Sequence, residues 1–473
     1  LGISLNLGYR QHRATLDNVR QDYQNVDASP AYRWRTEVRD FTNIRTRYGG
    51  GLKIDYKLSE DSSIYANFTL SPHTEPGSSL SMVLQNAQSI AVINATTGQP
   101  TGTGAVMPGY TDDRTEVRPL TTSFMNLINL WHNRKAFSGS GQVGGRVRKP
   151  MWELDYDTSY SYARNNLWNY SSTIGIRGLG WITDTTGQDR WSPTVEFTGG
   201  PDPYNLDNFT ENALTHLETP VQNEINGAQI NYRRKFDVAV PASLKVGAKY
   251  RVENQQRWNY NKRWDYVGAD GIEGSADDRL SQFQDLGYNY SPVDGTYPAR
   301  PFVSTKALVE NLHAHPELWR EDITYRIQQN LIGRRSLKEE VLAAYLMGDV
   351  KLGQLTVLGG LRVEQTDVRG TGSVINLTAE ERARRAAWVG PVTEAEAIRR
   401  VNAEYGGRRT ATQNYRNVFP GIHFKYEPVD RLIFRASSSN GIGRPAFTAI
   451  TPNDTILEDS RIVQAANPGL KPQ

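Results

Sequence analysis

The chain has 473 residues, a hydrophobic fraction of 38% and a formal net charge of +3, from 54 basic and 51 acidic residues. This hydrophobic fraction is low for ordinary globular domains, and balanced charge without blocks of one sign gives no indication of nucleic-acid binding. The absence of cysteine excludes disulfides, thiolate metal sites and cysteine nucleophiles, and the absence of an apolar run of about 18 residues excludes a helical membrane span.

Short segments that alternate apolar and polar side chains begin at the first residues and recur along the chain. Such alternation is typical of β-strands with one face in an apolar medium and the other in water. The clearest copies lie at 3–10, 52–58, 64–70, 137–147, 152–165, 243–253, 355–366, 420–428 and 431–439. In all we count about eleven strands, many near the roughly 9–11 residues that cross a bilayer at a tilt. Because the chain opens in a strand without a signal peptide, we expect a mature or truncated piece.

The segment 152–165 shows the alternation over an unusual length. Its even positions carry Trp152, Leu154, Tyr156, Thr158, Tyr160 and Tyr162, and its odd positions carry Glu153, Asp155, Asp157, Ser159 and Ser161. An aromatic face opposite an acidic face predicts a strand between lipid and a water-filled lumen.

The links between strands alternate in length. Short, turn-like links are predicted near residue 60 and at 148–151, 237–242, 351–354 and 427–431, and long links at roughly 72–120, 166–220, 265–337 and 370–412. This asymmetry is that of an outer-membrane barrel with short periplasmic turns and long extracellular loops. Thr-x-x-Glu capping boxes at Thr378 and Thr393 predict short helices inside the last loop, and 304–312 is a third helix candidate.

The inward faces of the predicted strands carry charged side chains. They are Lys245, Lys249, Arg251, Glu253, Arg362, Glu364, His423, Lys425 and Arg435. Charges would be costly in a packed core and are harmless in a wet lumen, so we expect a large barrel. Within this set we take Arg251, Arg362 and Arg435 as candidate ligand contacts.

Two stretches near the end of the chain resemble a known family. Residues 431–452, followed by Asn467, Pro468, Leu470, Lys471 and Pro472, resemble the strand, loop and Asn-Pro-x-Leu-Lys-Pro signature of TonB-dependent outer-membrane receptors. Residues 339–366 are similar to the preceding hairpin in the same family. Together with the spacing of strands and loops, the resemblance extends over essentially the whole chain, although only the last third holds specific motifs.

This resemblance implies an all-β fold, a transmembrane antiparallel β-barrel of about 22 strands whose lumen is plugged. We expect residues 1–473 to form a partial barrel domain, because the N-terminal plug and the last strands of the family are missing from the sequence. The family implies location in the bacterial outer membrane, contact with the bilayer and lipopolysaccharide, and energy from the TonB–ExbB–ExbD complex. The ligand would be a siderophore–iron chelate, cobalamin or an oligosaccharide, bound and released with no cofactor and no bond broken.

Aromatic residues near the long loops are the remaining ligand-contact candidates, because flat rings above a wet lumen can stack on sugars or planar chelates. They are Trp168, Tyr170, Trp181, Trp258, Tyr260, Trp264 and Tyr266. For each single residue, an interface girdle or loop packing is the more common role. The stretch 257–264 also interleaves Arg and Lys with Trp and Tyr, which suits either an anionic ligand or lipopolysaccharide.

Other functions have weaker support in the sequence. Residues 270–279 are acidic and glycine-rich but lack the register of an EF-hand, and His313 and His315 have no clear third ligand, so we expect no metal site. The seven histidines are scattered, no nucleophile arrangement is visible, and we expect no catalytic residue. A passive porin remains the main alternative and a barrel enzyme the lesser one, although porins have shorter loops and lack the signature.

Overall fold

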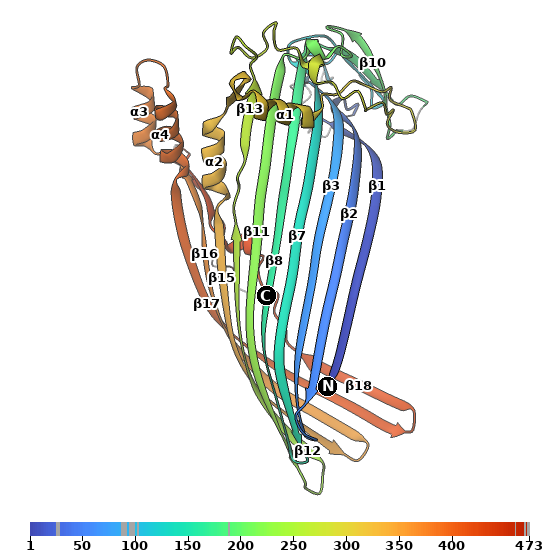
Figure 1. Cartoon of the computed structure of the whole chain (residues 1–473), viewed down its shortest axis with the longest axis vertical. Helices are drawn as coiled ribbons and strands as arrows, with labels where there is room; N and C mark the ends of the chain where they lie inside the picture. The colour runs from blue at the N-terminus through green and yellow to red at the C-terminus, as the bar shows by residue number, and fades with distance from the viewer. Residues whose placement is uncertain are drawn as a thin grey trace.

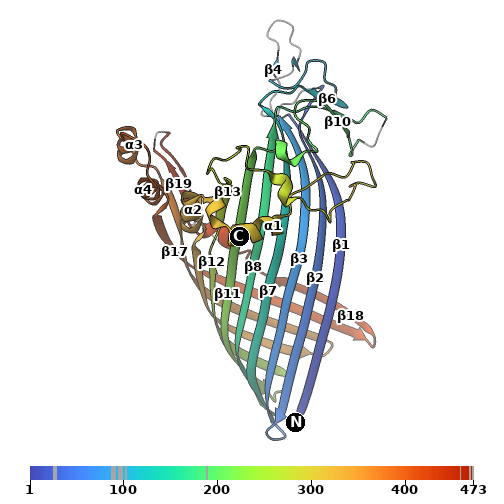
Figure 2. The same cartoon turned by 45° about the horizontal axis from the view of Figure 1, so that its top comes forward.

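The main body of the protein is one strongly curved antiparallel sheet. In the computed structural model, which describes residues 1–24, 29–86, 92–93, 100–101, 104–187, 190–458, 460–467 and 470, eleven strands follow one another in the order β1-β2-β3-β7-β8-β11-β12-β15-β16-β17-β18. Chain neighbours are therefore sheet neighbours, as in an up-and-down barrel. Figures 1 and 2 show the curl, in which β15–β18 pass behind β1–β8. The prediction of about eleven antiparallel strands is confirmed.

The strands of this path are long. They are β1 (Gly2–Tyr23), β2 (Arg33–Lys57), β3 (Ser62–Asn86), β7 (Ser123–Lys149), β8 (Trp152–Arg177), β11 (Glu211–Phe236), β12 (Ala242–Arg257), β15 (Arg335–Leu352), β16 (Leu355–Asn376), β17 (Gly407–Val429) and β18 (Leu432–Ser439). With 26 residues, β8 is far longer than a bilayer requires. The expectation of strands near the minimal crossing length was therefore wrong for most of the sheet. The links predicted at 166–220 and 370–412 begin later and end earlier than expected, the link predicted at 72–120 begins later, and the link predicted at 265–337 begins earlier, directly after Arg257.

The remaining elements lie in the upper links and near the C-terminus. The short strands are β4 (Val92–Ile93), β5 (Pro100–Thr101), β6 (Arg114–Val117), β9 (Gly180–Asp184), β10 (Thr194–Gly199), β13 (Lys262–Tyr266), β14 (Trp319–Glu321), β19 (Asn453–Leu457) and β20 (Ile462–Gln464). The helices are α1 (Thr305–Ala314), α2 (Ile323–Gly333), α3 (Ala379–Ala386), α4 (Glu394–Tyr405) and α5 (Phe447–Ile450), with 3-10 turns η1 (Leu206–Asn208), η2 (Leu280–Phe283) and η3 (Pro316–Leu318).

The two faces of the sheet differ in chemistry. One face, which we name the belt face, carries exposed apolar side chains on the lower half of every long strand, such as Leu5, Phe68, Tyr160, Ile230 and Leu346. The opposite face, which we name the polar face, carries the predicted charged residues. Asp155 accepts a hydrogen bond from Asn231 on this face and Asp157 accepts one from Gln229. An apolar outer band opposite a polar interior is the pattern of a membrane barrel, and the assignment of faces in 152–165 follows the same parity.

The lower ends of the strands are joined by the short turns that the sequence predicts. These links are 58–61, 150–151, 237–241, 353–354 and 430–431. Three of the five have only two residues, and two of these, β7 to β8 and β15 to β16, join strands whose residues on either side of the turn are paired with each other. In the second of these, Gly353 has a φ of 59°, which a two-residue hairpin turn favours and which costs glycine nothing.

The largest hydrophobic core lies on the belt face, above the exposed band. There the upper strands contribute Leu84, Met125, Ile174 and Leu214, all buried. The upper links fold down over them with Leu280, Phe302, Val303 and Leu308, which belong to the same core. We name this covering the loop layer (residues 104–122, 178–210 and 258–322, as far as they are described). Figure 1 shows α1 of this layer in front of β7 and β8. The long strands are thus stable above the membrane because the loop layer buries their upper apolar side chains.

The three predicted helices are present. Ser304, Thr378 and Thr393 each accept a hydrogen bond from the backbone N–H three residues later, as N-caps of α1, α3 and α4. Sequence analysis did not identify α2 or the short α5.

After β18 the chain returns along the polar face. This return segment (residues 440–458) contains α5 and β19, and β19 pairs in parallel with the upper end of β16. Phe447 and Ile450 pack with Leu337, Val368 and Tyr415 in a second, smaller core.

Candidate functional site on the polar face

A group of basic side chains lies on β1 and β2, at the level where the apolar band ends. Arg10 stands directly opposite Arg47 across the two strands, and His12 stands opposite Arg45. Together these four residues, which we name the cationic cluster, line a cavity of about 200 Å³. Like charges directly opposite each other across a sheet are destabilising, so the sequence maintains a local excess of positive charge here at some cost in stability.

One carboxylate lies beside the cationic cluster. Glu75 of β3 is buried and accepts hydrogen bonds from Arg45, at 2.6 Å, and from Asn43. His73 lies 3.5 Å from the other oxygen of Glu75, and Arg134 of β7 is the cross-strand neighbour of Glu75. One acid thus serves several bases, and no ion pair joins Arg10 or Arg47 to an acid among the described residues. Guanidinium groups without partners can bind carboxylates, phosphates or anionic chelates in bidentate fashion.

Sequence analysis missed the cationic cluster, although a signal was present. The stretches "YRQHR" and "IRTRY" place bases at alternate positions, which puts them on one face of a strand. Detecting it required following the parity of the first strand beyond residue 10 and knowing that the first two strands are paired.

A second charged group lies on β12, β15 and β16 and includes two of the three predicted arginines. Arg251 contacts Glu253 and Glu339, and Arg362 contacts Glu364 at 2.7 Å. Arg444 of the return segment bridges the strands, 2.7 Å from Glu339 and 2.8 Å from Glu364. We name these six residues the arginine–glutamate network. Its three cations match three carboxylates, so its first role is to hold the return segment on the sheet.

The third predicted arginine is elsewhere. Arg435 lies on β18 opposite Lys425, near the lower end of the sheet, and its side chain is exposed. It does not join Arg251 and Arg362.

The predicted aromatic contacts do not form one site. Trp168 and Tyr170 of β8 lie on the belt face, where they pack with Trp131 of β7 and His216 of β11. The Tyr170 ring stacks on the imidazole of His216 at 4.4 Å between ring centroids, and Tyr170 is buried. This aromatic group sits between the exposed band and the loop layer, in the position of an interface girdle.

The other predicted aromatics are divided between the loop layer and the strand ends. Trp181 is buried in the three-stranded sheet of β6, β9 and β10, and Tyr266 packs edge-on against Phe283 and Trp319. Trp264 packs against the same core, with Lys262 above its ring. Trp258 and Tyr260 lie where β12 passes into the loop layer, and Tyr260 is exposed. Ligand contact by these residues stays a prediction.

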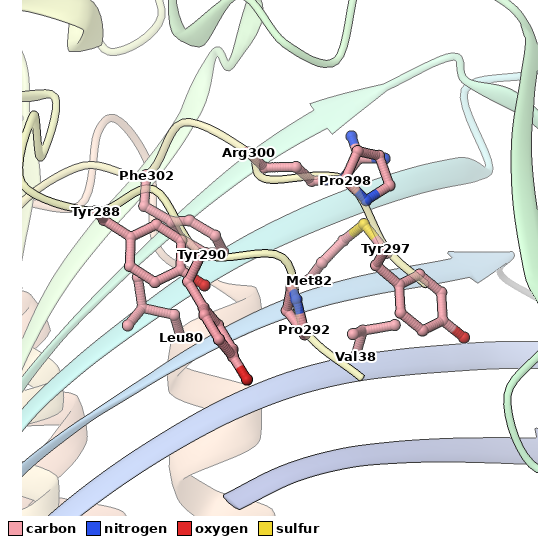
Figure 3. Close-up of a pocket in the computed structure, with 10 residues that line it drawn as sticks. All are labelled: Val38, Leu80, Met82, Tyr288, Tyr290, Pro292, Tyr297, Pro298, Arg300 and Phe302. Atoms are coloured by element: carbon pink, nitrogen blue, oxygen red, sulfur yellow. The ribbon is translucent and has the colours of Figure 1, made fainter. Parts of the chain in front are cut away.

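The loop layer contains a small pocket of its own (Figure 3). Tyr288, Tyr290, Tyr297 and Phe302 close over Leu80 and other belt-face residues of β2 and β3. Arg300 is 7% exposed and lies between the rings of Phe197 and Tyr204, and burial lowers the pKa of its guanidinium group. Burial likewise raises the pKa of Tyr288 above its ordinary value. These groups anchor the loop layer to the sheet.

The resemblance signature lies beyond the return segment. The backbone N–H of Asn467 donates to Ala449, and the carbonyl of Leu470 accepts from the Gln413 side chain. Pro468, Lys471 and Pro472 are outside the described residues.

The acidic stretch 270–279 forms a compact turn. Asp277 accepts backbone hydrogen bonds from Ala269 and Asp270, and Asp278 accepts one from Gly274. Within the described ranges, no group of three or more histidine and acidic side chains is arranged to hold a metal ion. No helix in the described part of the chain has the length and apolar character needed to cross a membrane.

Comparison with known proteins gives one family match. Residues 320–473 match the model of the Outer membrane protein beta-barrel family. The protein is an all-β protein of the outer membrane. No curated protein matches the chain. A solved structure, described as the siderophore receptor PiuA from Acinetobacter baumannii, is similar with a TM-score of 0.31 and 11% identity, over 90% of this chain and 49% of that chain. This chain thus spans about half the length of that receptor.

Proposed function

We propose that this protein is the barrel of a TonB-dependent receptor that binds an anionic nutrient on its polar face and imports it. The observation that supports this most is the cationic cluster of Arg10, His12, Arg45 and Arg47, which has more positive charge than its neighbours neutralise. The cluster lies at the upper edge of the apolar band, where a ligand entering from the loop side would arrive. A carboxylated or catecholate iron chelate fits this chemistry best among siderophore–iron, cobalamin and oligosaccharide ligands.

Energised import is favoured over a passive pore for a different reason. The return segment already occupies part of the polar face, and the motif at 431–472 resembles receptors driven by TonB–ExbB–ExbD. We do not propose an enzymatic role. On the polar face His73 lies beside the carboxylate of Glu75, as a catalytic histidine would, but the side chains around His73 are bases and not a nucleophile. We therefore propose binding and release without bond cleavage.

The test measures uptake of a labelled ferric tricatecholate, cobalamin and an acidic oligosaccharide in cells that make the native protein. We expect one anionic ligand to accumulate, and a protonophore to abolish its uptake. The double variant Arg10→Gln/Arg47→Gln removes the two arginines that have no acid partner and should lower that uptake about tenfold or more, since charge-assisted hydrogen bonds contribute about 1.5–3 kcal/mol each. The matched control is Lys338→Gln/Arg369→Gln, which removes two bases from the belt face.

Two outcomes would contradict separate parts of the proposal. Uptake that persists with the protonophore would identify a passive porin. Equal uptake by the Arg10→Gln/Arg47→Gln variant and its control would remove the cationic cluster from the ligand path, while energised import could still stand.

A further inference from the structure

Two acids face each other on the belt face, where the upper part of β1 pairs with β2. Asp17 stands directly opposite Asp40 in the register of the two strands. On its other side Asp40 stands opposite Leu80 of β3, which belongs to the large hydrophobic core. Like charges that face each other across a sheet are destabilising, so this acid pair needs a group that neutralises it.

The loop layer covers the acid pair. The hydroxyl of Tyr290 donates a hydrogen bond to Oδ2 of Asp17 at 2.8 Å, and the backbone N–H of Val293 donates one to the same oxygen at 2.6 Å. Figure 3 shows the Tyr290 ring beside the Tyr288 ring at the pocket described above. Under this cover Asp40 is only 8% exposed. The two carboxylates are therefore largely removed from water, which is costly for charges without a partner.

Each acid has a buried oxygen atom without a hydrogen-bond partner, namely Oδ1 of Asp17 and Oδ1 of Asp40. The belt-face positions of β2 and β3 contain no base, and the only base at such a position on β1 is Arg13, four residues from Asp17. Four residues of a strand span roughly 13 Å, too far for an ion pair. Arg300 of the loop layer is held between two aromatic rings. No base thus neutralises the pair in the described part of the chain.

The other polar groups near the acid pair are also oxygen atoms. One belt-face step below, Thr15 stands opposite Thr42, with 3.5 Å between their hydroxyl oxygens. Oxygen ligands alone favour a hard cation such as calcium over zinc or copper. Calcium takes about six to eight oxygen ligands and accepts water among them. Two carboxylates therefore suffice as the charged part of a site, although they are fewer than the groups of three considered above.

We propose that Asp17 and Asp40 bind one calcium ion, which fixes the link 285–300 to the upper parts of β1 and β2. The ion contacts Oδ1 of both acids, and Oδ2 of Asp17 continues to accept from Tyr290 and Val293. One cation thus removes the repulsion across the strands and strengthens the attachment of the loop layer. A proton shared by the two acids would neutralise the pair in a different way, and its pH dependence distinguishes it from calcium. This inference does not depend on the proposed transport function.

The experiment is hydrogen exchange of residues 285–300 in the purified native protein, with and without calcium chloride at matched ionic strength. Calcium sites of extracellular modules have dissociation constants of about 10⁻⁴–10⁻³ M. At about ten times the dissociation constant, calcium should slow local exchange about tenfold, because it binds only while the link is closed over the acids. Equilibrium dialysis with calcium measures the number of ions bound to each protein.

Asp40→Asn is the most informative variant, because it removes one of the two charges and Oδ1 of Asp40 has no partner to lose. Without calcium, residues 285–300 should exchange more slowly in this variant than in the wild type, since the repulsion is gone. Calcium should then slow them no further, and the variant should bind one calcium ion fewer. The control is Glu196→Gln, which removes an exposed acid of the loop layer and should respond to calcium as the wild type does.

Heat-modifiable migration on a gel first shows that each variant keeps a folded barrel. If calcium fails to slow exchange of 285–300 in the wild type, the proposal is overturned, and slowing by mildly acidic pH in its place would identify a shared proton. Equal calcium responses of the wild type and Asp40→Asn would also overturn the proposal, because the ion would then bind elsewhere.

Discussion

At the scale of single residues, the direction of a side chain decides whether a charge is tolerated. Ile230 and Gln229 are neighbours on β11, yet Ile230 is 51% exposed on the belt face and Gln229 donates a hydrogen bond to Asp157 on the polar face. A charged side chain introduced at position 230 would therefore lie in hydrocarbon, whereas the same side chain at position 229 would lie in water beside a carboxylate.

We expect Ile230→Arg to destabilise the folded barrel by about 2–4 kcal/mol, the cost of an arginine in the middle of the lipid band. Gln229→Arg should fold like the wild type, because its guanidinium group can pair with Asp157. Urea refolding into vesicles measures the free energy of unfolding of both variants. A similar loss in both would mean that the two faces are assigned incorrectly.

Arg444 is the residue on which the return segment depends. It bridges Glu339 and Glu364, and Glu339 is almost fully buried. Arg444→Gln leaves Glu339 with Arg251 alone, so we expect residues 440–458 to open locally, with a loss of about 1–3 kcal/mol. Hydrogen exchange of that segment measures the change. Arg444→Lys is the control, because a single ammonium group can reach one carboxylate and should restore part of the protection. Equal protection of residues 440–458 in the wild type, Arg444→Gln and Arg444→Lys would exclude the Arg444 bridge as the anchor of the return segment.

At the scale of elements, α3 and α4 form a hairpin held by charges rather than by an apolar core. Glu381 and Glu396 are both buried and contact four arginines, Arg384, Arg385, Arg399 and Arg400. Burial alone would raise the pKa of Glu381, but hydrogen bonds from Arg385 and Arg384 outweigh it and hold the pKa below the ordinary value of 4.5. The pKa of Glu396 is lowered in the same way, against burial, by Arg400 and Arg384.

A lowered carboxylate pKa stabilises the folded hairpin above the ordinary glutamate value, and this stabilisation is lost as the pH falls through the lower, folded-state pKa. We therefore expect α3 and α4 to keep their protection at neutral pH and to lose it below about pH 4. Hydrogen exchange, corrected for the intrinsic rate, provides the measurement. In the variant Glu381→Gln/Glu396→Gln this loss of protection at low pH should disappear. In the control variant Glu380→Gln, which changes an exposed glutamate, it should persist. Helix α1 buries apolar residues and should keep its protection at low pH in all of these proteins.

The sequence predicted these elements to different degrees, for physical reasons. Caps such as Thr378 and Thr393 act within four residues, so α3 and α4 could be predicted from local pattern. The lower turns were also predictable, since alternation breaks there. The upper halves of the strands were not, because residues such as Met125 and Ile174 are buried in a core that includes Leu280, Phe302 and Leu308, which lie more than a hundred residues away in the sequence. The cationic cluster and the arginine–glutamate network depend on cross-strand register and on the path of the return segment, which no local pattern reveals.

At the scale of the whole molecule, the two ends of the sheet lie on opposite sides of the membrane. The α3–α4 tip carries Val389, which is 93% exposed, and the lower turn between β2 and β3 carries exposed Glu60. The chain has no cysteine, so a single introduced thiol reports its own position without a background signal.

We expect a membrane-impermeant maleimide to label Val389→Cys in intact cells. Glu60→Cys should stay unlabelled until the outer membrane is permeabilised, because the short turns face the periplasm. Denatured protein labelled to the same degree at both positions is the control for thiol reactivity. Labelling of Glu60→Cys in intact cells would reverse the orientation.

The two-residue turn between β7 and β8 has a consequence for how the protein is made. Pairing the residues on either side of this turn costs little conformational entropy, because the closed loop is so short. Pairing the upper ends of β12 and β15 costs more, because the 77 residues of 258–334 separate them. Pairing should therefore begin at the periplasmic turns and close upward, hairpin by hairpin. The polar loop segments must then be carried across the bilayer while the sheet is still growing, so the slow step of biogenesis would be the passage of the 258–334 link and not the pairing of strands.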